Sequence, residues 1–216
     1  MKLFISRKLE PESFIAETAK KKSWILTDIA LIEHIPCETA KQPPLSDLIF
    51  FTSPTSVRLF LNAFGIPNSP VATMGTGTSK ALPTAITPAF EGVGTSQEVA
   101  RKFSAFAQNE TVFFPIGDQS ARTIQQALRP EQCIESIIYK TLPKPIVLSE
   151  QDVYVFTSSS NVRSFLQTNL PIKNKTVIAL GQRTANELQK SSIPSLLSKD
   201  YTPEGIIHTI FSIVGS

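Results

Sequence analysis

The chain has few of the residues on which catalysis, metal binding and cross-linking most often depend. It contains two cysteines and two histidines in 216 residues. Cys37 and Cys133 form no CxxC pair, which argues against a disulfide framework and against a thiolate metal site. His34 and His208 belong to no HExxH or paired-histidine motif. We therefore expect no metal site, and we expect His208 on the surface and His34 pointing to solvent.

Long apolar runs are also missing. The longest, Leu48–Phe51 and Val153–Phe156, have the length of strands, whereas a helix needs about 20 apolar residues to cross a bilayer. The apolar run within Met1–Lys8 is too short for a signal peptide. The net charge of +3 is mild, and no basic stripe is interleaved with aromatic residues. We expect a cytoplasmic monomer that binds neither membrane nor nucleic acid.

What the chain does contain is an internal repeat. The segment LIFFTSPTSVRLFL at Leu48–Leu61 matches VYVFTSSSNVRSFL at Val153–Leu166 in seven of fourteen positions. Ordinary residue frequencies give about one such match. A second pair, Val71–Leu82 and Val177–Leu188, shares its Val, Gly, Thr and Leu at nearly the same offset. We interpret the chain as the product of an internal duplication.

Each half is predicted to alternate strands and helices. The apolar runs are typical of strands that are buried on both faces of a parallel sheet, and the hydroxyl residues after them are good helix N-caps. By pattern, a strand at Leu3–Ile5 with a helix to about Lys22 resembles a strand at Val112–Phe114 with a helix to about Leu128. The expected fold class is α/β, with two doubly wound parallel-sheet domains.

The loops after the predicted strands hold the candidate binding residues. Ligands of open parallel sheets bind at the carboxyl ends of the strands. Backbone N–H groups at helix starts, together with hydroxyls, can cradle a carboxylate or a phosphate. Since the two copies offer equivalent loops, we predict that one cleft is lined by Ser53, Thr78, Ser158 and Thr184. The alternative for each of these residues is a plain structural role as a helix cap.

The order and spacing of the motifs resemble the uroporphyrinogen-III synthase family over essentially the whole chain. The matching motifs are FTSP at Phe51–Pro54, GxxT at Gly75–Thr78 and Gly181–Thr184, FPxGD at Phe114–Asp118 and the TPEGI of Thr202–Ile206. The chain departs from the family at Lys8, where a proline is usual, and at Ile116, where an arginine is common.

This resemblance implies a particular division of the chain. The first strand and helix would join the C-terminal segment, so that residues 1–33 and 146–216 form one discontinuous domain and residues 38–136 form the other. Residues 29–37 and 134–145 would be the two segments of a β linker. The linker tyrosine of the family corresponds to Tyr139.

The resemblance also implies a reaction. Hydroxymethylbilane, a linear tetrapyrrole, would be cyclised to uroporphyrinogen III with loss of water and inversion of ring D, without a cofactor. Tyr139 is the candidate catalytic residue, for assisting departure of the hydroxyl, and its alternative role is packing within the linker. The candidate substrate-binding residues are Arg7, Ser53, Gly75, Thr78, Ser158, Gly181 and Thr184.

Two other functions stay open on the sequence. A non-catalytic two-lobed module that binds a small molecule would also suit duplicated α/β domains. A nucleotide-dependent transferase is disfavoured, because Gly75–Lys80 lacks the four-residue gap of a P-loop before its glycine and lysine.

Overall fold

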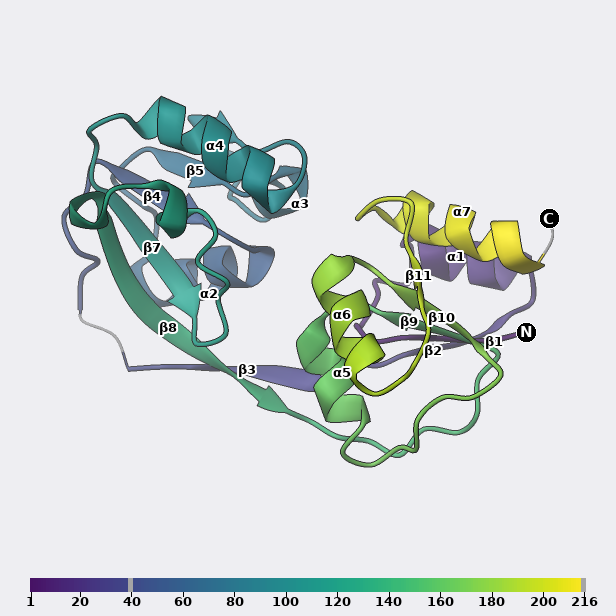
Figure 1. Ribbon diagram of the computed structural model, residues 1–216. Helices are drawn as coiled ribbons and strands as arrows, with labels where there is room; N and C mark the ends of the chain where they lie inside the picture. The colour runs from purple at the N-terminus through teal and green to yellow at the C-terminus, as the bar shows by residue number, and fades with distance from the viewer. Residues whose placement is uncertain (39–40, 215–216) are drawn as a thin grey trace. The chain divides into compact units, whose positions relative to one another are not determined.

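The computed structural model describes residues 1–38 and 41–214. The chain divides into two units, each with a sheet of its own (Figure 1). Unit 1 comprises Met1–Glu33 and the chain from Leu142 onward, and unit 2 comprises His34–Thr141. No helix in the described parts of the chain is both long and apolar enough to cross a membrane.

Unit 1 is built on a five-stranded sheet of order β11-β10-β9-β1-β2, in which every strand pair is parallel. The strands are β1 (Lys2–Ile5), β2 (Ile25–Asp28), β9 (Val153–Phe156), β10 (Thr176–Ala179) and β11 (Leu196–Leu197). The helices are α1 (Phe14–Lys21), α5 (Ser159–Phe165), α6 (Gln182–Lys190) and α7 (Pro203–Val214).

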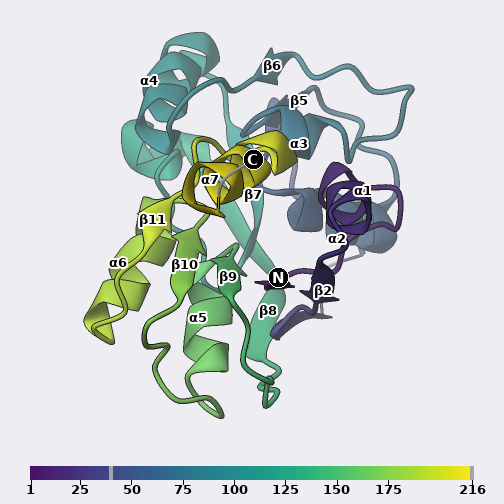
Figure 2. The ribbon, with the colours of Figure 1, turned by 90° about the vertical axis from the view of Figure 1, so that its right-hand side faces the viewer.

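Both faces of the unit 1 sheet are covered, as its apolar strands require. Leu3 and Ile5 of β1 face a cluster that includes Ile15 of α1 and residues of α7, and these two helices lie side by side (Figure 1). Phe4 faces the opposite cluster, with Val162 of α5 and residues of α6, which also lie side by side (Figure 2). The alternation of side chains along a strand divides the core into these two layers.

Unit 2 contains a six-stranded sheet of order β3-β8-β7-β4-β5-β6. The strands are β3 (Ile32–Pro36), β4 (Leu48–Phe51), β5 (Val71–Thr73), β6 (Phe90–Glu91), β7 (Val112–Gly117) and β8 (Cys133–Pro143). The helices are α2 (Pro54–Phe64), α3 (Thr76–Ser79) and α4 (Ser96–Ala107), with 3-10 turns η1 (Gln125–Ala127) and η2 (Pro130–Gln132). The pairs from β8 to β6 are parallel.

The predicted α/β class with parallel sheets is confirmed, but one predicted helix is wrong. The helix expected to run to about Leu128 is replaced by the short turn η1. Between Asp118 and Gln126, Ile124 is the one large apolar residue, and it is buried in the core. One such side chain cannot make the apolar stripe of an amphipathic helix, and Arg122 adopts a left-handed backbone conformation with φ of 54°.

Candidate active site

Tyr139 lies on β8 where the pairing of this strand with β7 changes register. The two strands pair one to one as far as Ile116 with Ile137, and then Gly117 stands opposite Tyr139. Consecutive strand residues normally point to opposite faces, but Ile138 and Tyr139 both pack into the same apolar cluster. The extra residue therefore redirects the tyrosine, as bulges next to active sites often do.

Three groups of unit 2 surround the ring of Tyr139. A Cβ on Gly117 would lie 2.5 Å from two ring atoms of the tyrosine, so only glycine leaves room for the ring. The ring of His34 meets the tyrosine edge-on, with 5.1 Å between the centroids. Ser53 forms a hydrogen bond with the phenol. These contacts leave the side chain 8% exposed.

The phenol is suited to donate a proton. Burial raises the pKa of Tyr139, nearby Asp118 raises this pKa further, and the hydrogen bond with Ser53 opposes the shift. A phenol titrates near pH 10 without any such shift, so Tyr139 is neutral and protonated at neutral pH.

His34 does not point to solvent, so that expectation is wrong. The side chain is half-buried, and its Nδ1 lies 3.3 Å from the hydroxyl of Thr141. Burial lowers the pKa of His34, as does the charge of Arg58, while Asp118 opposes both effects. Alternation along a strand does not reveal which set of side chains faces its neighbours, because that depends on strand register.

Asp118 and Thr141 connect the loop after β7 to the end of β8. The backbone N–H of Thr141 donates to the Asp118 carboxylate at 2.9 Å, and the N–H of Asp118 donates to the carbonyl of Tyr139 at 3.1 Å. The side-chain amide of Gln119 donates to the carbonyl of Thr141 at 3.1 Å. The backbone on both sides of Tyr139 is thereby fixed. Sequence reasoning assigned no role to Gly117, Asp118 or His34, although FPxGD included the first two.

Ser53 and Ser158 occupy equivalent positions as helix N-caps. Ser53 accepts the N–H of Ser56 at 3.1 Å at the start of α2, and Ser158 accepts the N–H of Asn161 at 3.2 Å at the start of α5. The amide of Asn161 also donates to the Ser158 hydroxyl oxygen at 2.8 Å. Both serines therefore have the structural role that was their alternative, and Ser53 contacts Tyr139 in addition.

Gly75 and Gly181 begin α3 and α6 in the same way. Neither provides a side-chain cap, so the first N–H groups of these helices have no side-chain oxygen from the cap residue. Thr78 and Thr184, one turn in, are 5% and 4% exposed. The two threonines are thus buried, which leaves little of their side chains to contact a ligand.

Arg7 follows β1 at the carboxyl end of the unit 1 sheet. Its Nε is buried and has no hydrogen-bond partner among the described residues. Burial lowers the pKa of Arg7, but a guanidinium stays charged in proteins. A partly buried cation with an unpaired N–H is suited to bind an anionic group.

The predicted site residues fall into two groups. Tyr139, Ser53, Gly75 and Thr78 belong to unit 2, near the carboxyl ends of β7, β4 and β5. Arg7, Ser158, Gly181 and Thr184 belong to unit 1, near the carboxyl ends of β1, β9 and β10. The two groups occupy corresponding strand ends of two similar sheets.

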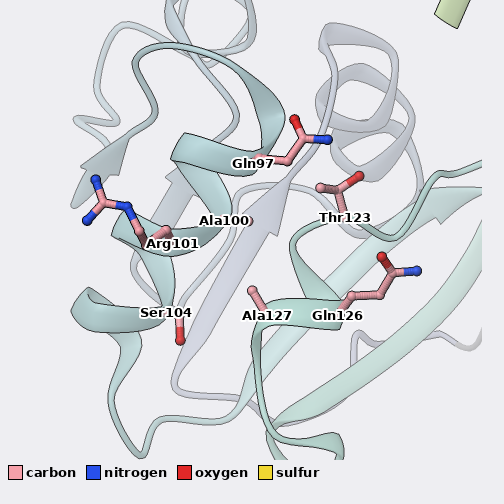
Figure 3. A pocket seen from close by; sticks show the side chains of 7 residues that line it. All are labelled: Gln97, Ala100, Arg101, Ser104, Thr123, Gln126 and Ala127. Carbon is pink, nitrogen blue, oxygen red and sulfur yellow. The ribbon is translucent and has the colours of Figure 1, made fainter.

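A surface hollow of about 530 Å³ lies elsewhere in unit 2, between α4 and the segment around η1 (Figure 3). Its walls are Gln97, Ala100, Arg101, Ser104, Thr123, Gln126 and Ala127. It includes none of the predicted site residues. Among residues 1–38 and 41–214, no group of three or more His, Cys, Asp or Glu side chains could hold a metal ion.

Comparisons with known proteins relate these features to one family. The family model described as uroporphyrinogen-III synthase HemD matches residues 13–208. The crystal structure of uroporphyrinogen-III synthetase from Helicobacter pylori is similar with a TM-score of 0.68 and 19% identity, over 98% of this chain and 99% of that one. A mutant uroporphyrinogen III synthase from the extremely thermophilic bacterium Thermus thermophilus gives a TM-score of 0.61 and 16% identity, over 98% and 97% of the two chains. No curated protein is significantly similar to the chain.

At these identities the solved structures show the fold, and the family model supplies the activity, since it covers most of the chain. The chain belongs to the uroporphyrinogen-III synthase family, lyases of tetrapyrrole biosynthesis that act on a linear tetrapyrrole.

Proposed function

We propose that this protein cyclises hydroxymethylbilane to uroporphyrinogen III, with Tyr139 as the proton donor to the departing hydroxyl. The observation that carries the proposal is the protonated phenol, redirected by the register shift and held against Gly117. It offers an acid at the carboxyl ends of the strands, where ligands of such sheets bind.

Tyr139 would act at both ends of the reaction. Its phenol gives a proton to the hydroxyl, which leaves as water, and the pyrrole nitrogen supplies the electrons to form an azafulvene. Ring D attacks through its substituted carbon, and the spiro intermediate fragments and recloses with ring D inverted. The proton lost at the final ring closure returns to the phenolate, so no residue is consumed.

The remaining candidates would position the substrate. Hydroxymethylbilane is a flexible octacarboxylate that closes to the type I isomer without the enzyme, so holding it in the required shape is the larger task. Arg7 would bind one carboxylate, and the N–H groups at the start of α6 would bind another. Ser53 and Ser158 would hold the loops in shape, and buried Thr78 and Thr184 would hold the helix turns.

The two units would be products of the duplication, with the order of segments shifted. The strand order β2-β1-β9-β10-β11 of unit 1 corresponds to β8-β7-β4-β5-β6 of unit 2. In this correspondence β9 and β10 match β4 and β5, which are the strands of the two repeated segments. It supports residues 1–33 with 146–216 and residues 38–136 as domains, with residues 29–37 and 134–145 as linkers.

The test is incubation of the purified protein with enzymically generated hydroxymethylbilane, followed by separation of the type I and type III isomers. Type III product from the wild-type protein supports the activity. Tyr139→Phe should slow its formation by roughly 10²- to 10⁴-fold, the contribution of one positioned proton donor. Tyr154→Phe is the matched control, because Tyr154 is a buried tyrosine like Tyr139 but lies on β9, where its hydroxyl accepts the N–H of Gln151.

The outcomes separate the activity from the role of the tyrosine. A wild-type protein that leaves only type I product would disprove the activity, and bilane binding without turnover would favour a non-catalytic module. Type III product at the wild-type rate from Tyr139→Phe would disprove the acid role alone.

A further inference from the structure

His34 is a titratable group beside the proposed acid that the proposed mechanism does not use. It comes from β3, at the edge of the unit 2 sheet, next to β8. Its ring lies at 81° to the ring of Tyr139, which is the edge-on geometry that aromatic pairs favour. The sheet order and this contact together bring the histidine to the tyrosine.

The ring of His34 is itself oriented. Its Nδ1 and the hydroxyl of Thr141 are 3.3 Å apart. The N–H of Thr141 in turn donates to the carboxylate of Asp118. The histidine is therefore connected to the same backbone segment that carries Tyr139, two residues before Thr141.

The contacts of Tyr139 differ in how rigid they are. Gly117 contacts the tyrosine through its backbone, which is fixed in β7. Ser53 is held in place by a reciprocal capping box with Ser56. His34 is a side chain of an edge strand, so its packing is the contact that a single substitution removes with least damage to the fold.

We infer that His34 is a positioning residue for this reaction, whose ring holds the phenol of Tyr139 in the orientation from which it donates its proton. The inference rests on the proposed function, because it assumes that Tyr139 is the acid. It assigns the histidine no contact with substrate.

The charge state of His34 should matter to this role. Arg58 from α2 and Asp118 from the loop after β7 act on it electrostatically, in opposite directions, and burial disfavours its charged form. The neutral ring is thus the form present at neutral pH. Protonation at lower pH places a cation beside Tyr139, which lowers the pKa of the phenol and changes the hydrogen bond with Thr141.

The experiment compares His34→Leu, His34→Phe and Thr141→Val with the wild-type protein, and Glu33→Gln is the control because Glu33 is an exposed neighbour on β3. Steady-state kinetics with hydroxymethylbilane give kcat and KM for type III product. Spectra of the protein labelled with ¹³C-tyrosine report Tyr139 directly, assigned by its loss in Tyr139→Phe. Tyr154 and Tyr201 are internal controls, since the chain has three tyrosines.

His34→Leu should reduce kcat about two- to tenfold, in line with the loss of one edge-on aromatic contact, with KM near the wild-type value. The Tyr139 signal should move while those of Tyr154 and Tyr201 stay. His34→Phe should restore kcat at neutral pH. It should also remove the acid-side titration that we expect in the Tyr139 signal of the wild type. Thr141→Val should lower kcat as His34→Leu does, but by a smaller factor.

An unmoved Tyr139 signal in His34→Leu would overturn the inference, and so would a failure of His34→Phe to restore kcat. If Tyr139→Phe keeps full activity, the proposed acid is wrong, and the tyrosine signal alone then decides whether His34 positions that ring. A uniform loss of folded protein in His34→Leu, seen in all three tyrosine signals, would count against a positioning role.

Discussion

Arg7 has a buried side-chain N–H that no described residue compensates. A buried charged group without a partner destabilises a fold, and replacing it by an apolar residue of similar volume is often neutral or favourable. The Nε of Arg7 has no partner among the described residues, although Lys8 beside it pairs with Asp28 at 3.2 Å. Such a loss of folding stability is expected where the charged group serves to bind a ligand.

We predict that Arg7→Met raises the KM for hydroxymethylbilane about ten- to a hundredfold, the value of one hydrogen bond to a charged group. Its Tm should equal or exceed that of the wild type, because an uncompensated charge is removed. Lys8→Met is the control, since this exposed lysine should leave KM unchanged. Steady-state kinetics and thermal unfolding provide both values. A lowered Tm with an unchanged KM would mean that Arg7 is purely structural.

At the scale of elements, α2 and α5 begin in the same way but differ in what their caps touch. Ser53 and Ser158 each accept a hydrogen bond from the third residue of the helix. Ser53 also bonds the phenol of Tyr139, whereas Ser158 is bonded by the amide of Asn161. That asparagine accepts the N–H of Leu31 at 3.0 Å, so the cap of α5 is tied to the segment after β2.

We predict that Ser53→Ala and Ser158→Ala each lower the free energy of unfolding by about 0.5–2 kcal/mol, the usual cost of losing an N-cap. The two variants should differ in their effect on the pKa of the Tyr139 phenol. Its phenol pKa should rise further in Ser53→Ala, because the hydrogen bond that opposes the shift is lost, and stay unchanged in Ser158→Ala. Denaturant unfolding and ¹³C-tyrosine titration measure the two effects. Equal phenol pKa values in both variants would contradict the contact of Ser53 with Tyr139.

At the scale of the whole molecule, the two units differ in how the chain builds them. Unit 2 is one continuous stretch with its own sheet and apolar clusters on both faces. Unit 1 needs two stretches, because β1 lies between β2 and β9 in its sheet. The segment from Leu142 onward therefore keeps β9, β10 and β11 side by side, but it lacks the side chains that β1 contributes to the apolar clusters on both faces of the sheet.

We predict that residues 32–143, which keep β3 and β8 whole, fold as a separate chain, whereas residues 142–216 alone do not. Circular dichroism and thermal unfolding of each fragment test this, and a cooperative transition is expected in the first alone. Adding residues 1–33 to the second fragment should restore structure, since this supplies β1 and β2. Failure of residues 32–143 to unfold cooperatively would show that unit 2 depends on unit 1.

The sequence by itself determined the fold class and the positions of the loops. The runs Leu48–Phe51 and Val153–Phe156 are strands buried at every residue, and Ser53 and Ser158 cap the helices after them. Apolar runs and N-caps are local signals, because they depend on residues within a few positions of one another. The motifs whose order indicated the family lie at the ends of strands or in the segments that follow them.

Only the tertiary structure decided what surrounds Tyr139. The shift that sets it opposite Gly117 arises from the pairing of β7 with β8, and the contact with His34 arises because β3 lies at the edge beside β8. His34 and Tyr139 are about a hundred residues apart, and a change of one residue in register would turn either side chain to the other face. Local patterns contain no information on such pairings, which are set by the packing of the whole sheet.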